Sequence, residues 1–180
     1  MRLKLMEPYP AATEAVRAVR DMSGWGTPLS ADGVKSRGRG VAFCLSFGTW
    51  VAQVIEVADT DDGIRIEKVW CAADFGTALD PANLEAQMMS GIIFGLSAAM
   101  GQEITFADGA AEQGNFDTYD AMRMNQTPQI EVRVLATSGK MGGAGEPGTP
   151  PSLPALANAI FAATGKRIRQ LPLSKEITFA

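Results

Sequence analysis

The stretch VAFCLSFGTWVAQVIEV (residues 41–57), together with the turn DDG (61–63) and the run IRIEKVWC (64–71), decides the fold. Apolar residues alternate with others in the first part of this stretch, and the apolar character continues past Gly48, which is typical of a half-buried β-strand. Asp and Gly tolerate the positive φ of tight hairpin turns, so the chain is predicted to reverse at 61–63. The sequence therefore predicts one long antiparallel hairpin, with a continuous strand over 41–57 and a return strand from 64 to about 71.

Three helices are predicted around this hairpin. Residues 10–22 carry one apolar face and end before Gly24. Asp80 and Pro81 are suited to the N-cap and first turn of a helix that reaches about residue 99. A closing helix is expected over 154–164, with Gly165 as its C-cap.

Two further segments have the patterns of strands. Asp108-Gly109 lies between 103–107 and 112–116 and predicts a second hairpin. Residues 129–136 alternate apolar with charged side chains, which predicts a strand with one wet face. Helices thus alternate with hairpins, and the expected fold class is α+β: largely antiparallel hairpins packed with two or three helices. The 180 residues suffice for one core, so a single domain over 1–180 is expected.

The composition excludes several kinds of site. The chain has no histidine, so a Ser-His-Asp or Cys-His catalytic site and a His-based metal site are excluded, and no metal ligand is predicted. Cys44 and Cys71 are too few for a disulfide framework and are predicted to be reduced core residues. The formal net charge of -4 gives no nucleic-acid footprint, and the apolar run 88–100 is too short to span a membrane. Residues 1–6 are cut off by Glu7 and two prolines before a secretion signal could form, so the choice between cytoplasm and periplasm depends on signals outside this chain.

The segment GKMGGAGEPGTPP (139–151) is the unusual one. Four glycines in its first seven residues precede Glu146, and prolines come after it. Glycines permit tight backbone and close approach of a ligand, whereas prolines restrict the backbone around them, so Glu146 is expected on a stiff arm within a loop over 139–154. A carboxylate held in this way suits a general base. The alternative is a solvated loop glutamate. A phosphate-binding P-loop is excluded because no GK[ST] follows the glycines.

The run GGAGEPGTPPSLPALANAIFAATGKRIRQLPL (142–173) resembles the C-terminal signature of large, molybdopterin-binding subunits of the xanthine dehydrogenase/aldehyde oxidase family, isoquinoline 1-oxidoreductase beta-subunit type. In that family the glutamate of a G-x-G-E-P-x-x-P-P-like loop is the active-site base. The resemblance therefore implies that Glu146 is catalytic and that Gly143 and Gly145 contact the cofactor.

Three further segments resemble the family in the same order, so the resemblance covers nearly the whole chain. They are RGRGVA (37–42) with SFGTWVAQV (46–54), DP (80–81) with QMMSGIIFGLSAA (87–99), and NF (115–116) with MRMN (122–125) and PQIEV (128–132). The second segment corresponds to the helix that faces the cofactor, which implies that Gln87 donates its amide to the pterin. This chain departs from the family in having Phe75-Gly76 for a usual Cys-Gly, and Met89-Ser90-Gly91 for a common Glu-Gly-Gly.

The resemblance implies the C-terminal portion of a molybdenum cofactor-binding domain in a hydroxylase, which oxidises an aldehyde or N-heterocycle with oxygen derived from water. The implied cofactor is molybdopterin, for which the cytosine dinucleotide is one form that fits. The implied partners are the remaining N-terminal part of the large subunit and a small [2Fe-2S] subunit. Family subunits are much longer, so the chain is expected to be a fragment or half of a split subunit, inactive and without cofactor by itself.

Other interpretations of the same residues stay open. The chain could be a non-catalytic assembly module, or a hydrolase that pairs Glu146 with Asp74 or Asp80, although nothing in the sequence places a second acid beside Glu146. Gln87 could be an exposed or helix-packing residue. Glycines 91 and 95, one turn apart in a predicted helix, could serve helix-on-sheet packing or the approach of a cofactor.

Overall fold

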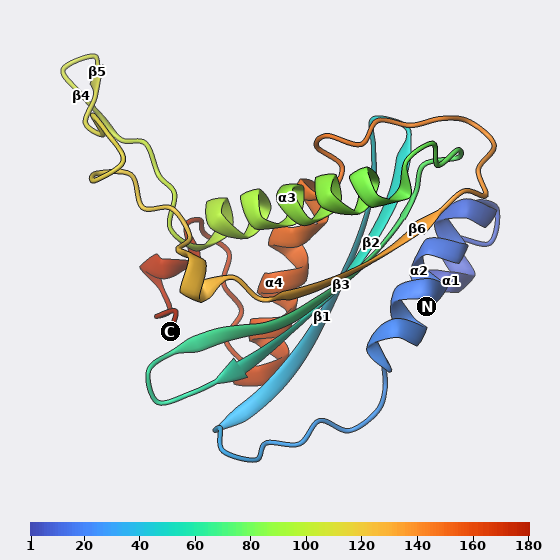
Figure 1. The fold of residues 1–180 in the computed structure, drawn as a ribbon. Helices are drawn as coiled ribbons and strands as arrows, with labels where there is room; N and C mark the ends of the chain where they lie inside the picture. Colours follow the sequence, from blue (N-terminus) through green and yellow to red (C-terminus); the bar gives the residue numbers. More distant parts are fainter.

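A four-stranded mixed sheet, in the order β1-β2-β3-β6, carries the fold (Figure 1). The computed structural model describes residues 1–180. Strands β1 (Ser36–Ser46), β2 (Thr49–Asp59) and β3 (Ile64–Asp74) pair antiparallel in sequence order. Strand β6 (Gln129–Leu135) is parallel to β3, from Lys68 opposite Gln129 to Asp74 opposite Leu135.

The predicted continuous strand over 41–57 is wrong, because the chain turns back at Phe47-Gly48. Ser46 pairs with Thr49, and the two residues between them have φ of 50° and 80°, which is the signature of a tight two-residue hairpin turn. A positive φ is uncommon for a bulky residue like Phe47. Because Phe47 also continues the apolar alternation, the sequence gives no sign of the turn. The predicted turn at 61–63 and the return strand from Ile64 are confirmed, and that strand continues to Asp74.

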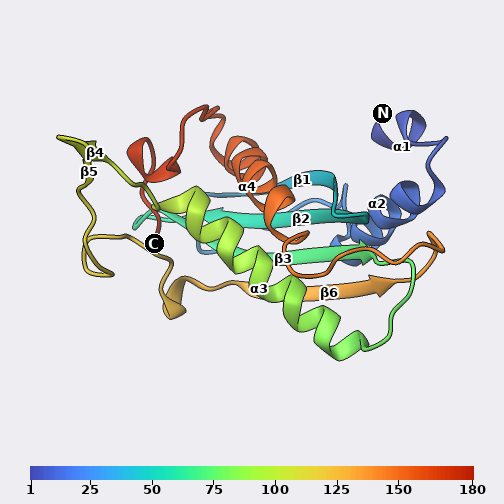
Figure 2. The ribbon, with the colours of Figure 1, turned by 90° about the horizontal axis from the view of Figure 1, so that it is seen from above.

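Helices cover both faces of the sheet (Figure 2). Helix α2 (Pro10–Ser23), with the short α1 (Arg2–Leu5) beside it, packs against β2 and β3. Helices α3 (Pro81–Met100) and α4 (Thr149–Thr164) pack together on the opposite face. A buried cluster lies under each layer; the larger is under α3 and α4, with Val51, Ile55, Ile92, Leu156 and Ile160 among its fully buried members. The predicted α+β class is therefore confirmed.

The predicted capping residues agree with the helix ends, but the last helix starts earlier than predicted. The Asp80 side chain accepts a hydrogen bond from the Asn83 N–H at 3.1 Å, and Gly165 ends α4 in the left-handed conformation. Helix α4, however, begins at Thr149 rather than at residue 154. Prolines at 150 and 151 are tolerated there because first-turn N–H groups have no partner within a helix.

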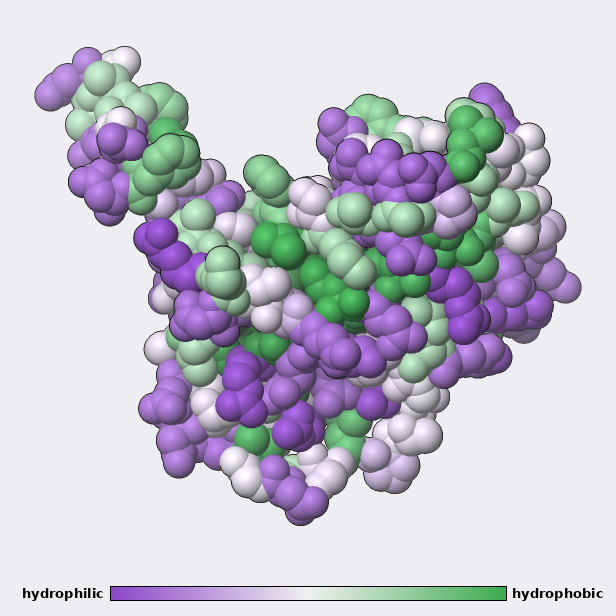
Figure 3. Space-filling view, viewed as in Figure 1, coloured by the Kyte–Doolittle hydropathy of each residue, from purple (hydrophilic) through white to green (hydrophobic).

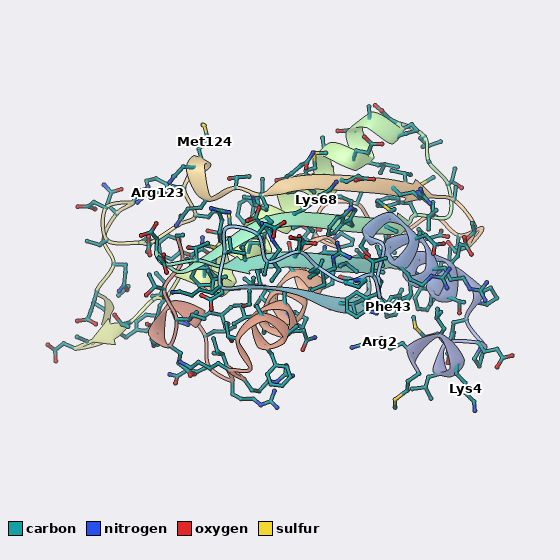
Figure 4. The ribbon with its side chains drawn as sticks, turned by 90° about the horizontal axis from the view of Figure 1, so that it is seen from below. Arg2, Lys4, Phe43, Lys68, Arg123 and Met124 are labelled. Carbon is teal, nitrogen blue, oxygen red and sulfur yellow. The ribbon has the colours of Figure 1, made fainter.

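The chain between α3 and β6 (residues 101–128) forms an arm whose outer part, with strands β4 (Phe106–Ala107) and β5 (Ala110–Ala111), projects from the body (Figures 1 and 3), whereas Met122 packs back against the core. Strands β4 and β5 pair across the predicted Asp108-Gly109 turn, but they are much shorter than the predicted strands. The arm also contains the 3₁₀ turn η1 (Met124–Gln126), where Met124 points away from the body (Figure 4). A second such turn, η2 (Leu173–Lys175), lies near the C-terminus.

Figure 3 shows a band of apolar side chains across the middle of one face, where α3 and β6 lie. None of the helices combines the length and the apolar character that a segment crossing a bilayer would need.

Candidate functional site: the Glu146 arch

Residues 143–148 form an arch whose first residue is held by the β1–β2 hairpin. The Gly143 N–H donates to the Phe47 carbonyl at 2.8 Å, and the Thr49 hydroxyl donates to the Gly143 carbonyl at 2.6 Å. Just before the arch, the Gly142 N–H donates to the Phe75 carbonyl at 3.0 Å. The chain therefore enters the arch at a position fixed by two turns of the sheet.

The last residue of the arch is held from below by β2. The Gln53 Nε2 donates to the Gly148 carbonyl at 2.7 Å, and the Thr149 N–H donates to the Glu146 carbonyl at 2.9 Å. The Thr149 hydroxyl also donates to the Gly91 carbonyl of α3 at 2.9 Å. Both ends of the arch are thus tied to regular elements, which is the stiff arm that the glycines and prolines predict.

Glu146 itself is exposed and its side chain makes no hydrogen bond or ion pair within the chain. The backbone N–H groups of Ala144, Gly145 and Glu146 donate to no other backbone group. Ala144, by contrast, packs against the larger core cluster. The arch therefore has an exposed carboxylate, which the chain alone does not enclose, and three backbone N–H groups without a partner in the backbone.

Contacts within the chain explain some of the glycines of this segment but not all of them. A Cβ on Gly142 would lie 2.2 Å from the Thr49 hydroxyl oxygen, and one on Gly143 would lie 3.0 Å from the Phe47 Cβ. A Cβ on Gly145 would meet nothing within 4 Å, and the φ of Gly145 is not positive. Packing within the chain explains Gly142 and Gly143 but leaves Gly145 open for a group outside the chain.

This difference predicts different effects on stability. We expect Gly142→Ala to lower the free energy of unfolding by about 1–3 kcal/mol, because the arch must move off β2. We expect Gly145→Ala to change it by less than about 0.5 kcal/mol. Urea unfolding of the two variants measures both values, and equal losses would contradict this explanation of the glycines.

Helix α3 approaches the arch through two glycines. A Cβ on Gly91 would lie 3.3 Å from the Gly148 Cα, and one on Gly95 would lie 2.7 Å from the Thr149 carbonyl oxygen. Gly91 and Gly95 thus admit the start of α4, which is helix–helix packing rather than helix-on-sheet packing. Gln87 is exposed one turn before Gly91, and its side chain makes no hydrogen bond within the chain.

Asp74 holds the base of the glycine-rich segment. Its buried carboxylate accepts hydrogen bonds from the Gly76 N–H at 2.9 Å, the Thr137 N–H at 3.0 Å and the Ser138 hydroxyl at 2.9 Å, and also from the Thr137 hydroxyl. Burial by itself would raise the pKa of the Asp74 carboxyl, but the hydrogen bonds from Thr137, Gly76 and Ser138 outweigh it and hold the pKa below its usual value. Asp74 joins β3 to this segment, and Asp80 caps α3, so neither is a free acid of the kind that a hydrolase would pair with Glu146.

Sequence reasoning missed Gln53, which is fully buried in β2. Its signal was a single amide among the apolar positions 51, 55 and 57 that share one face of the strand. Cys71 lies opposite Gln53 in the sheet; burial raises the pKa of its thiol to about 12, so it is the reduced core residue that was predicted. Cys44 is also free but only half-buried, which corrects its placement in the core.

Two hollows of the chain lie away from the arch. One lies between α1, α2 and the sheet, with Val16, Val19 and Trp25 in its wall. Another lies between α1 and α4, where Arg2 and Phe43 lie side by side (Figure 4). No three His, Cys, Asp or Glu side chains are grouped so that they could hold a metal ion. Any metal centre at the arch would have to be held by other groups.

Comparison with solved structures identifies the class of fold. Quinoline 2-oxidoreductase from Pseudomonas putida 86 matches 69% of this chain and 17% of its own, with a TM-score of 0.63 and 21% identity. The Cu,Mo-CO dehydrogenase matches 71% of this chain and 18% of its own, with a TM-score of 0.61 and 22% identity. This chain has the fold of one portion of each of these two chains.

The sequence model of the family described as "Molybdopterin cofactor-binding domain" matches residues 8–128. The chain belongs to this family. It is 36% identical over 174 residues to isoquinoline 1-oxidoreductase subunit beta from Brevundimonas diminuta, a match that covers 96% of this chain and 22% of that protein. It is 31% identical over 161 residues to a membrane-bound aldehyde dehydrogenase from Gluconacetobacter polyoxogenes, covering 88% of this chain and 21% of that protein. The chain thus spans about a fifth of the length of these relatives, and the predicted family and subunit type are confirmed.

Proposed function

We propose that this chain supplies Glu146 as the general base of a molybdenum hydroxylase, which oxidises an aldehyde or an N-heterocycle with oxygen derived from water. One observation carries the proposal: both ends of the arch are hydrogen-bonded to β2, while the Glu146 carboxylate takes no part in the fold. A carboxylate carried on a fixed backbone and left unpaired suits proton transfer, for which geometry matters first. The names of the two relatives, an isoquinoline oxidoreductase and an aldehyde dehydrogenase, support these substrate classes.

The exposed groups of the arch fit a molybdopterin cofactor, including its cytosine dinucleotide form. When bound, that cofactor supplies the metal centre that activates the oxygen and accepts electrons from the substrate. The free N–H groups of Ala144, Gly145 and Glu146 can donate to its polar edge, and the open space at Gly145 allows it to come close. Gly143 contributes shape, because its own N–H and carbonyl are used by Phe47 and Thr49. Gln87 supplies an exposed amide donor on α3.

Most of the cofactor contacts belong to other polypeptide. Phe47, which the arch contacts, is 69% exposed, and Met141, just before the arch, is 57% exposed. Apolar side chains left open beside a polar site suit coverage by another protein surface. We propose that the remaining N-terminal part of the large subunit covers them, and that a small [2Fe-2S] subunit takes up the electrons. In that assembly residues 1–180 act as a single C-terminal domain.

Cofactor content tests the proposal. Purified alone, the chain should contain no molybdenum or pterin, whereas the subunit completed with its N-terminal part should contain both. In the complete enzyme, Gly145→Val should lower the pterin content, because its side chain fills the open space. Gly114→Val is the matched control, since the surroundings of Gly114 are equally open but it lies on the arm. A complete subunit that folds without pterin would instead support a non-catalytic assembly module.

A further inference from the structure

A buried amide in the middle of the sheet links β2 to the arch. Gln53 is 0% exposed and lies on the face of β2 that carries Val51 and Ile55. A glutamine in such surroundings is costly unless both ends of its amide are paired. Both are: Nε2 donates to the Gly148 carbonyl at 2.7 Å, and Oε1 accepts from the Ser152 hydroxyl at 2.9 Å.

The chemistry of the partners fixes the orientation of this amide. The Gly148 carbonyl can only accept, so the NH₂ group must face it and Oε1 faces the Ser152 hydroxyl. This hydroxyl lies within hydrogen-bond distance of both Oε1, at 2.9 Å, and the Gly148 carbonyl, at 3.0 Å. Helix α4 starts directly after Gly148, so Gln53 bonds both to the last residue of the arch and to the first turn of the helix. No other side chain of the sheet bonds to Gly148.

Thr49 and Gln53 together hold the two ends of the arch from one strand. They are four residues apart on β2, so their side chains share a face and their Cα atoms are about 13 Å apart. Thr49 bonds to Gly143 at the entry and Gln53 bonds to Gly148 at the exit. Gly148 also packs on α3, where a Cβ on it would lie 2.9 Å from the Met88 carbonyl oxygen. The spacing of two β2 side chains thus sets the span over which Glu146 is carried.

We propose that Gln53 is the positioning residue for Glu146: by holding the Gly148 carbonyl, it fixes where the Glu146 carboxylate is presented. The inference rests on the proposed function for its effect on turnover. Its structural part, the ordering of the arch, concerns this chain alone. Gln53 touches neither cofactor nor substrate and acts only through the backbone of the arch.

The structural part is tested on the 180-residue chain with Gln53→Met, which keeps the length of the side chain but cannot donate to Gly148. Amide hydrogen exchange at Thr149, whose N–H donates to the Glu146 carbonyl, should become at least tenfold faster than the overall loss of stability explains. Ile55→Val is the matched control, because it disturbs the same face of β2 without touching the arch. The inference is overturned if the exchange at Thr149 changes only as much in Gln53→Met as in the control.

The functional part is tested in the complete enzyme. Gln53→Met should lower kcat roughly 10- to 100-fold with little change in KM, since the base is displaced while substrate binding is kept. Gln53→Glu should turn over faster than Gln53→Met wherever its buried carboxyl is protonated, because that carboxyl can still donate to the Gly148 carbonyl. A kcat for Gln53→Met equal to that of Ile55→Val would overturn the inference. Loss of the proposed function itself would be recognised separately, by full turnover in a Glu146→Gln enzyme, and the exchange measurement would then still decide whether Gln53 orders the arch.

Discussion

Glu146→Gln lowers kcat of the complete enzyme by roughly 100- to 10,000-fold, the usual range for the loss of a general base, and leaves molybdenum and pterin content unchanged. An amide has nearly the shape of the carboxylate but cannot take up a proton. Because the Glu146 side chain makes no contact that the fold needs, the variant should unfold at the same urea concentration as the wild type. Steady-state kinetics and metal analysis on the same preparation measure both effects.

The control for this variant is Glu7→Gln, which removes the same charge from another exposed glutamate without an ion pair. Its kcat should equal that of the wild type. Glu146→Asp adds a test of the stiff arch: the shorter side chain withdraws the carboxylate by about 1.5 Å, and an arch held at both ends cannot move to compensate, so about 100-fold in kcat should be lost. Full turnover in Glu146→Gln would leave the chain as a non-catalytic module.

The second large effect concerns stability. Asp74→Asn should lower the free energy of unfolding at neutral pH by about 2–4 kcal/mol, because it removes a charged acceptor and turns an NH₂ group toward the N–H groups of Gly76, Thr137 and Ser138. Asp80→Asn, at an exposed N-cap where Asn caps as well as Asp, should cost less than about 0.5 kcal/mol. Equal losses in the two variants would mean that the Asp74 hydrogen bonds do not stabilise the fold.

The same carboxylate predicts the direction of a pH dependence. The pKa of Asp74 is lower in the folded chain than the value of about 3.9 expected in the unfolded chain. Its contribution is therefore complete above about pH 5 and is lost as the pH falls from there through the folded-state pKa. Urea unfolding of the wild type should show this loss of stability between about pH 5 and pH 3. Asp74→Asn should lose less stability over the same range, because it lacks the part that comes from Asp74. Parallel acid profiles for the two proteins would contradict the assignment.

Much of the fold could be predicted because its signals are local. The turn at 61–63, the N-cap at Asp80 and the C-cap at Gly165 each depend on residues within a few positions of one another. The turn at Phe47-Gly48 has no such signal, because a bulky residue adopts the left-handed conformation inside an apolar alternation. The parallel pairing of β6 with β3 depends on strands separated by α3 and the whole arm, and no local pattern specifies it.

The stiffness of the arch was predictable from its glycines and prolines, but the side chains that support the arch were not. The glycines and prolines around Glu146 indicated a stiff arm, and the arch has one. The side chains that hold it belong to Thr49, Gln53 and Asp74, which lie 94, 95 and 63 positions before their respective hydrogen-bond partners. Only folding brings such residues together, and the chain itself leaves the carboxylate exposed.

The most direct test is the position of Glu146 in an experimentally determined structure of the complete large subunit with its cofactor. We expect the Glu146 carboxylate to face the metal centre, with one oxygen about 2.6–3.2 Å from a group that the metal binds, or one water away from it. A carboxylate that still faces bulk solvent in that structure, with the cofactor held elsewhere, would contradict the role proposed for the arch.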